Sequence, residues 1–137
     1  NQDNIKTVLL RDFKQIDDIG NFDVFYSLMV LQHNPPPIQK YLLMKVLEKA
    51  NDDAVVFFQV PTAIPNYSFS ACSYFETDVG DMEMHAIPMQ TVLKLLDDAG
   101  LFVLEVIQDH LTGMPGSTTF FAQKRAAIKD GSITTVI

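Results

Sequence analysis

Cysteine is almost absent from this sequence, and its scarcity excludes one class of protein. Cys72 is the only cysteine among 137 residues, so an intrachain disulfide cannot form and a secreted, disulfide-stapled domain is excluded. Long apolar runs are missing too, because none approaches the roughly 20 residues that a membrane-spanning helix needs. The polar start Asn1–Asn4 lacks the apolar segment of a signal peptide. We therefore expect a cytoplasmic protein with no membrane partner.

Basic residues are too few to balance the acidic ones. The chain has 10 Lys and Arg residues against 17 Asp and Glu residues, and its formal net charge is -7. A nucleic-acid backbone or an anionic membrane surface would repel such a chain, so we expect no nucleic-acid partner and favour a small molecule or another protein. The histidines His33, His85 and His110 have no close ligand spacing, so we predict no metal site.

Length and pattern indicate one α/β domain. A chain of 137 residues, 47% of them hydrophobic, suffices for one domain with its own core but not for two. Apolar, β-branched segments alternate with helical patterns, which predicts a mostly parallel sheet. The segment 54–60 is apolar apart from Gln59, so we expect it at the centre of the sheet, buried on both faces. The five expected strands are 7–10, 23–26, 54–60, 101–107 and 118–123, of which the last two form an antiparallel pair.

Two helices and one long loop complete the pattern. Pro35–Pro37 begin a helix that we expect to end at Asn51–Asp53, and a second helix runs from about Pro88 to Ala99, with Gly100 after it. Residues 62–87 have no period but many aromatic side chains. We expect an ordered loop that covers the C-terminal ends of the strands and holds substrate. The tail 125–137 is small and polar, either disordered or paired with an edge.

The run Phe22–His33, with the sequence FDVFYSLMVLQH, resembles the fourth-strand motif of class I S-adenosylmethionine-dependent methyltransferases. Further pieces follow in the order of that family: Asp12, Gln59–Pro61, Met84–Pro88, Ala99-Gly100 and Gln123-Lys124. The resemblance covers residues 4–124, which we take as the domain. It implies a partial Rossmann-like methyltransferase fold, with a mostly parallel sheet and an antiparallel final strand.

The sequence departs from the family in two places. Family members commonly carry a Pro-Gly-Gly-like turn where this chain has Asn51–Asp53. More seriously, the glycine-rich cofactor loop and the acidic residue that holds the ribose are not found, and the six glycines are too scattered to supply the loop elsewhere. The chain therefore resembles the C-terminal part of a methyltransferase domain, and we expect this part to be inactive alone.

The resemblance implies S-adenosyl-L-methionine as co-substrate of the full-length parent and a small molecule as methyl acceptor. In the family, the position of Asp12 accepts a hydrogen bond from the adenine amino group, and that of Phe13 lies against the ring. The alternative for Asp12 is a helix-capping or solvated carboxylate. Ser27 and Leu28, at the end of the next strand, would line the pocket near the methionine part.

His33 is the candidate general base, since a neutral imidazole can take a proton from a hydroxyl or an amine. The alternative is a structural role beside the proline-led helix. Methyl transfer from a sulfonium depends mainly on in-line positioning, so a base is not obligatory. Tyr67, Tyr74 and His85 fall in the expected substrate loop and are candidates for acceptor binding, with packing or surface positions as the alternative.

Two other classes of protein compete with the enzyme. One is a non-catalytic, methyltransferase-like interaction or dimerisation module, and the other is a different nucleotide-binding α/β protein. In the strand order of the family, two strands that this chain does not contain lie between 7–10 and 23–26. Their absence would bare a hydrophobic sheet edge, and such an edge is a template for pairing. We therefore expect self-association through an exposed sheet edge.

Overall fold

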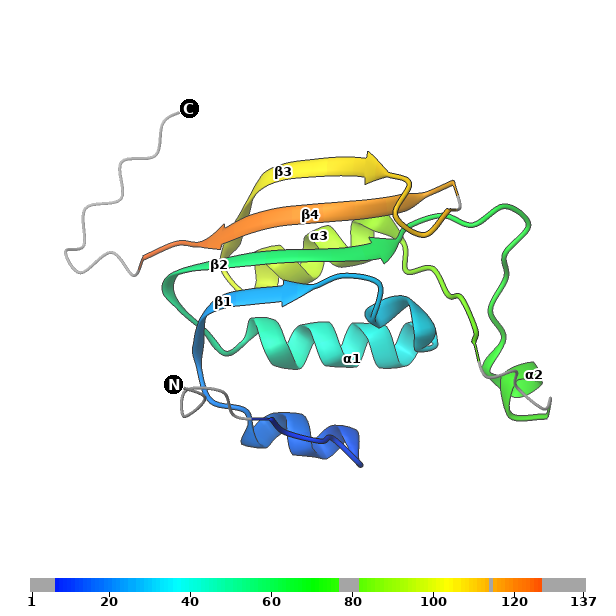
Figure 1. The fold of residues 1–137 in the computed structure, drawn as a ribbon, viewed down its shortest axis with the longest axis horizontal. Coiled ribbons are helices and arrows are strands. Elements are labelled where there is room, and N and C mark those ends of the chain that lie inside the picture. Colours follow the sequence, from blue (N-terminus) through cyan, green and yellow to red (C-terminus); the bar gives the residue numbers. More distant parts are fainter. Residues whose placement is uncertain (1–6, 77–81, 114, 127–137) are drawn as a thin grey trace.

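The computed structural model describes residues 7–76, 82–113 and 115–126. These residues form one sheet with helices against it (Figure 1). The expected start of the domain at Asn4 and most of the tail 125–137 lie outside the described residues. In the described part of the chain, no helix is long and apolar enough to cross a membrane.

The sheet has four strands: β1 (Phe22–Ser27), β2 (Ala50–Pro61), β3 (Leu101–Asp109) and β4 (Ser117–Lys124). Their order is β1-β2-β4-β3. β1 and β2 are parallel, whereas β4 is antiparallel to both β2 and β3, so β4 alone runs in the opposite direction. The mostly parallel sheet with an antiparallel final strand is confirmed, as is the interior position of β2.

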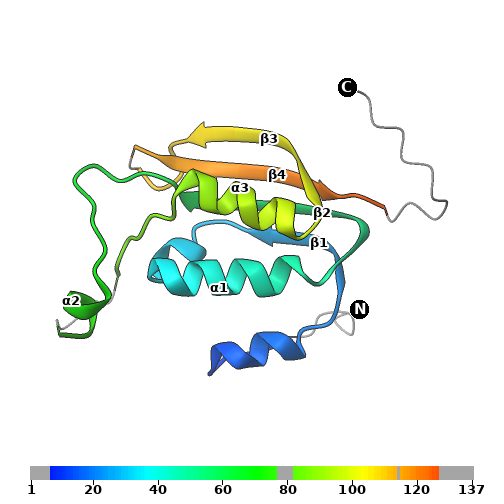
Figure 2. The ribbon, with the colours of Figure 1, turned by 180° about the vertical axis from the view of Figure 1, so that it is seen from behind.

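Two helices cover one face of the sheet, as Figure 2 shows from behind. α1 (Pro36–Leu47) has a proline at its first two positions, where the missing N–H costs nothing. α3 (Met89–Asp98) turns Val92, Leu95 and Leu96 inward, a helical spacing that the sequence already carries. Both predicted helices are confirmed.

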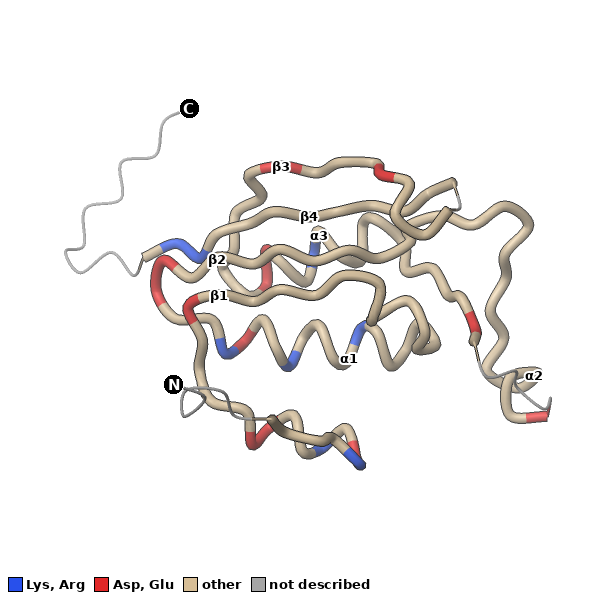
Figure 3. The backbone as a smooth tube through the Cα atoms, in the orientation of Figure 1, with Lys and Arg blue, Asp and Glu red and all other residues tan. Residues whose placement is uncertain are grey.

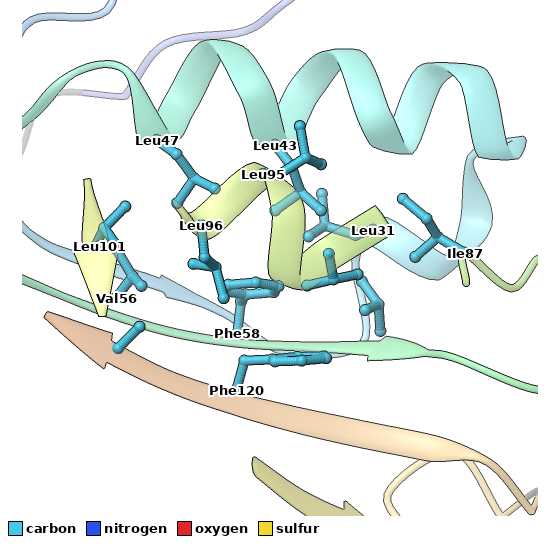
Figure 4. Close-up of a cluster of buried hydrophobic side chains, with 13 residues drawn as sticks. Leu31, Leu43, Leu47, Val56, Phe58, Ile87, Leu95, Leu96, Leu101 and Phe120 are labelled. Atoms are coloured by element: carbon cyan, nitrogen blue, oxygen red, sulfur yellow. The ribbon is translucent and has the colours of Figure 1, made fainter. Parts of the chain in front are cut away.

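The core lies between these helices and the sheet (Figure 4). Phe58 of β2 and Phe120 of β4 are fully buried, and their rings stack with centroids 5.3 Å apart. Leu43 and Leu47 from α1 and Leu96 from α3 close over them. Burying such side chains contributes about 1.5–3 kcal/mol each, which makes this cluster the main stabilising element of the domain.

The opposite side of the sheet, which we call the open face, is not covered by any helix in the described ranges (Figures 1 and 2). Val24 and Tyr26 on β1 are 68% and 66% exposed. Tyr26 stacks on Phe57 of β2, which also meets Phe121 of β4. Phe57 is only half-buried, so the expectation that 54–60 is buried on both faces is wrong for this side.

Residues 7–10 are not a strand, so the sheet has four strands rather than the expected five. Val8 and Leu9 are 52% and 71% exposed. The reason is that a strand exists only through hydrogen bonds to a neighbour, and the described part of the chain offers none at this position. An apolar, β-branched sequence is necessary for a strand but does not create its partner.

A short 3-10 helix, η1 (Phe13–Asp18), follows this segment and packs against α1. Ile16 is buried, and the rings of Phe13 and Tyr41 meet edge to face at 6.2 Å. Lys45 Nζ lies 3.4 Å from a carboxylate oxygen of Asp17. These contacts fix η1 to the outer helix layer rather than to the sheet.

The segment Asn51–Asp53 belongs to β2 and is not the end of α1, which corrects the prediction. Phe22 pairs with Ala50 but Val24 pairs with Val55, so β2 carries extra residues in a bulge. Asp53 has a φ of 64° there, a left-handed conformation that aspartate tolerates better than most residues. The bulge lets the strand begin directly after α1.

Residues 62–87 leave the C-terminal end of β2 and return to α3, with α2 (Ala71–Glu76) on the way. The return is tied to the sheet because the N–H of Ile87 donates to the carbonyl of Pro61. Its described parts, 62–76 and 82–87, extend sideways beyond the sheet edge (Figure 1). The segment begins at the expected edge, but these described parts do not cover the strand ends as predicted.

Candidate functional site

The C-terminal ends of β1 and β2 meet at one edge of the sheet, where open α/β sheets bind ligands. Ser27 ends β1, and both Ser27 and Leu28 are half-buried. The next residue, Met29, has a φ of 56° and donates its N–H to Gln59 Oε1 at 3.0 Å. The chain turn after β1 is therefore held by a buried amide of the neighbouring strand.

Gln59 begins a polar network that crosses the sheet. Its Nε2 donates to Ser117 Oγ at 2.9 Å, and Ser117 in turn donates to Asp109. Thr119 donates to the other carboxylate oxygen of Asp109. Gln59 and Ser117 are fully buried, so each needs these partners. The network ties the turn after β1 to β4 and β3.

The pKa of the Asp109 carboxyl lies below its usual range. Desolvation is the largest influence and raises the pKa, but the hydrogen bonds from Ser117 and Thr119, the Leu111 N–H and nearby His110 together outweigh it. A pKa depressed by folding contributes stability that is present above the unfolded-state pKa of about 3.8. That stability is lost as the pH falls through the lower folded-state pKa.

We predict that replacing Asp109 with asparagine removes this part of the acid sensitivity. As the pH is lowered below about 4, the free energy of unfolding of the wild-type protein should decrease. Asp109→Asn should have a lower free energy of unfolding at neutral pH, and that free energy should decrease less on acidification. Urea unfolding at a series of pH values measures both. An equal loss in the two proteins would show that Asp109 does not carry the effect.

A second group of side chains gathers in the segment after β2. We call it the aromatic-histidine cluster; it consists of Tyr67, Phe69, Tyr74, Glu83 and His85. His85 is 6% exposed, and the three aromatic rings lie edge-on to it with centroids 5.8 to 6.0 Å away. Its Nε2 lies 2.9 Å from Glu83 Oε2, and its Nδ1 lies 2.8 Å from the Tyr67 hydroxyl. The structure thus brings together all three predicted acceptor-binding residues.

The two phenols of the cluster have raised pKa values. For Tyr67, desolvation raises the pKa more than a hydrogen bond from the backbone of Ala86 lowers it, and Glu83 raises it further. For Tyr74, desolvation acts together with the charge of Glu83 and a hydrogen bond to it. Both phenols are therefore neutral at neutral pH and can donate a hydrogen bond.

A pocket of about 400 Å³ adjoins the cluster. Most of its wall is apolar, and Tyr67 is one of the residues that line it. Its lining includes Pro36, Thr62, Ile64, Tyr67, Phe69 and Ala86. A larger groove of about 550 Å³ lies between α1 and α3. We place the candidate site at the smaller pocket, because none of the predicted residues lines the groove, where Lys94 is already paired with Asp98.

His33 lies at the end of η2 (Leu31–His33) and is exposed. Its Nδ1 is 2.9 Å from the carbonyl oxygen of Glu83, so Nδ1 donates, and its Nε2 is 3.4 Å from Gln32 Nε2. Both ring nitrogens thus have protein partners. These contacts favour the structural role for His33, and its role as a base stays a prediction.

Asp12 and Phe13 do not lie where the sequence predicts. Asp12 follows no strand and instead caps η1. Its carboxylate accepts a hydrogen bond from the Lys14 N–H at 2.9 Å, and its own backbone N–H donates to Gln15 Oε1. Phe13 lies against Tyr41. The expected position at the sheet edge is wrong, because the strand that would carry Asp12 there has no partner.

Three polar residues of the site were not singled out from the sequence: Gln59, Glu83 and Asp109. A glutamine inside the apolar run Ala54–Val60 is the one local signal, because a buried amide needs partners. Glu83 stands two residues before His85, a spacing that predicts no contact in a loop.

The four-stranded sheet with its helices matches part of a Rossmann-like methyltransferase fold. The structure is similar to magnesium protoporphyrin IX methyltransferase from Synechocystis PCC 6803 with bound SAH (TM-score 0.55, 14% identity, 80% of this chain and 48% of that chain). It is also similar to an O-methyltransferase family protein from Burkholderia thailandensis (0.55, 15%, 84% and 33%). A third is a SAM-dependent methyltransferase from Methanosarcina mazei (0.52, 15%, 79% and 61%).

The chain spans 48% of the length of the first of these proteins and 33% of the length of the second. At such low identity the similarity establishes the fold. No protein-family model matches the sequence, and no curated protein does.

Proposed function

We propose that the full-length parent of this chain transfers a methyl group from S-adenosyl-L-methionine to a small-molecule acceptor. The observation that supports this best is the strand order β1-β2-β4-β3 with β4 reversed, in a fold similar to an SAH-bound methyltransferase. The candidate residues at the carboxyl ends of the strands add to it. We further propose that the enzyme acts in the cytoplasm.

In this proposal, Ser27 and Leu28 contact the methionine part of the co-substrate. They fit that role because Ser27 ends β1 and Leu28 follows it, both are half-buried, and the next residue, Met29, is held by Gln59. Asp12 and Phe13 reach the adenine only when residues 7–10 join a sheet and carry them to its edge. In this proposal Ser27 and Leu28 form only part of the co-substrate site, because the backbone N–H groups of a glycine-rich loop are needed to hold the carboxylate end.

The acceptor is a small molecule bound beside Tyr67, Tyr74 and His85. The pocket of about 400 Å³ falls in the size range of small-ligand sites. The net charge of -7 disfavours nucleic acid as a substrate. Among the described residues, basic and acidic positions are mixed along the backbone, and no stripe of basic residues follows the strands (Figure 3).

The alternative is a non-catalytic, methyltransferase-like dimerisation module, and the free edge of the sheet favours it. β1 pairs only with β2 and stands at the end of the strand order, so its outer backbone groups are unpaired within the described residues. Val24 and Tyr26 on the adjoining open face are exposed. An unpaired strand beside apolar side chains is a template for association, and we propose that the chain self-associates there.

The sequence encoded immediately upstream of Asn1 tests the enzyme directly. We expect a strand followed by a GxGxG-type loop, and we expect the product that includes it to bind S-adenosyl-L-methionine. The 137-residue chain alone should bind it weakly or not at all in a calorimetric titration, since the carboxylate end lacks its contacts. Sedimentation of the same sample should show a dimer or larger species.

Outcomes of this experiment separate the two functions. An upstream region without the glycine-rich loop would favour the dimerisation module over the enzyme. Micromolar binding by a monomeric 137-residue chain would contradict both the inactivity of the chain alone and its self-association. If the longer product contains the glycine-rich loop and still fails to bind S-adenosyl-L-methionine, the proposed reaction is refuted.

A further inference from the structure

Hydrogen-bond directions within the aromatic-histidine cluster follow from its geometry. Glu83 is a carboxylate and can only accept, so the His85 Nε2 at 2.9 Å carries the proton. In a neutral imidazole the other nitrogen then accepts. The Tyr67 hydroxyl, 2.8 Å from Nδ1, therefore donates to His85. The three groups form one chain of bonds from the phenol to the carboxylate.

The cluster holds this chain of bonds in one orientation. The rings of Phe69 and Tyr74 stand edge-on to the imidazole, and the His85 N–H donates to the Gln32 carbonyl at 2.9 Å. Tyr74 also has a hydrogen bond to Glu83. His85 is 6% exposed, so water has little access to replace either partner. Among the residues that the structure describes, the titratable groups in contact with His85 are Tyr67, Tyr74 and Glu83.

Tyr67 is the end of this chain that reaches the pocket. Tyr67 and Phe69 line the pocket of about 400 Å³, whereas His85 and Glu83 are not among its lining residues. The Tyr67 hydroxyl donates its own proton to His85. A phenol oxygen can accept as well as donate, so it can still accept a hydrogen bond from a donor in the pocket.

We propose that Tyr67 is a catalytic residue that accepts a hydrogen bond from an O–H or N–H group of a small, largely apolar acceptor, with His85 and Glu83 as its positioning residues. This rests on the proposed methyl transfer. As the acceptor oxygen or nitrogen attacks the methyl carbon, its proton passes to the Tyr67 oxygen and the phenol proton passes to His85 Nδ1. The carbon–sulfur bond breaks, and its electron pair stays on sulfur. The Glu83 carboxylate stabilises the imidazolium.

This assignment moves proton transfer from His33 to the buried cluster. Both nitrogens of His33 have protein partners, and its Nδ1 donates to the Glu83 carbonyl. That bond fixes the backbone of the residue whose carboxylate orients His85. In this proposal His33 supports the cluster, and the proton of the acceptor passes to Tyr67.

Binding of phenol and of anisole to the 137-residue chain tests the contact at Tyr67. Both probes are flat and apolar, but anisole has no O–H to donate. In an NMR titration followed at the amides of Ile64 and Ala86, phenol should bind about threefold to tenfold more tightly than anisole. In Tyr67→Phe this preference should fall to about one, while Tyr26→Phe, on the open face, should keep it.

Two outcomes would overturn the contact: an unchanged phenol preference in Tyr67→Phe, or no shift at the pocket amides with either probe. The titration contains no S-adenosyl-L-methionine, so its result does not depend on the proposed reaction. Loss of co-substrate binding by the longer product would refute the reaction alone, and failure of the phenol titration would refute the role of Tyr67 alone.

The tautomer of His85 tests the positioning residues. A long-range proton–nitrogen NMR spectrum of the wild-type chain should show the proton on Nε2, and Glu83→Ala should give a mixture of both neutral tautomers. Tyr67→Phe should leave the proton on Nε2. A wild-type proton on Nδ1 would overturn the assignment, and that measurement needs no variant to fold.

Discussion

Replacing Phe58 with alanine is expected to lower the free energy of unfolding by about 3–5 kcal/mol. Phe58 is fully buried and stacks on Phe120 at 5.3 Å, and it also contacts Phe25. Alanine there removes the buried ring and leaves a cavity beneath α1 and α3, which the rigid sheet cannot close. Urea-induced unfolding measures the loss.

The matched control for this substitution is Phe75→Ala. Phe75 is 85% exposed, so its removal should change the free energy of unfolding by less than about 0.5 kcal/mol. If Phe58→Ala were no more costly than this control, the packing between the helices and β2 would be refuted.

Gly116→Ala is expected to destabilise the protein by at least about 2–3 kcal/mol, the second large effect. Gly116 has a φ of 90°, and an added Cβ would stand 2.0 Å from the Ala63 carbonyl oxygen. A left-handed conformation alone costs a residue with a side chain about 1–2 kcal/mol. The clash adds to this because the same backbone holds β2 to β4, through the Thr62 N–H and the Gly116 carbonyl at 2.8 Å.

Gly113→Ala separates the two causes. Gly113 has a φ of 68°, but an added Cβ would meet nothing within 4 Å. This variant should lose only the conformational part, about 1–2 kcal/mol. Thermal unfolding of both variants measures the difference, and equal losses would mean that the contact with Ala63 does not constrain the turn.

The elements predicted correctly are those whose pattern is local. The sequence predicts strands at 23–26 and 101–107, which lie within the observed β1 and β3, and the spacing of Val92, Leu95 and Leu96 predicts one face of a helix. Their neighbours in the chain also become their neighbours in space. For that reason the reversed final strand followed from a turn-rich segment between two apolar runs.

The elements predicted wrongly depend on partners that no local pattern reveals. Val8–Leu10 has the composition of a strand, but composition does not supply hydrogen-bonding neighbours. Asn51–Asp53 has the composition of a turn, yet pairing with β1 draws it into a bulge. In both places tertiary context overrides local preference.

In the candidate site, too, residues marked by a local sequence pattern were predicted, whereas partners set by tertiary structure were not. Aromatic residues in a long segment after the strongest strand indicated a binding region, and Tyr67, Tyr74 and His85 do meet there. The partner that orients His85, Glu83, could not be found, because loop conformation sets which polar atoms approach. Asp12 was assigned through a strand that does not form, and its capping bond to Lys14 is the alternative that the sequence left open.

The insertion of β4 between β2 and β3 has a consequence for the order of folding. Among the described strands, the pairing between residues farthest apart in the chain is that of β2 with β4, at the middle of the sheet, where Val55 lies opposite Gln123. The side chain of Gln123 also donates from Nε2 to the carbonyl of Asp53, 70 residues away in the chain. Contacts of high sequence separation slow folding. During synthesis β2 emerges before β4, so its second edge stays unpaired until β4 is made. Until then Phe58 lacks its stacking partner Phe120, and the nascent chain exposes an unpaired apolar strand, the kind of surface that favours aggregation.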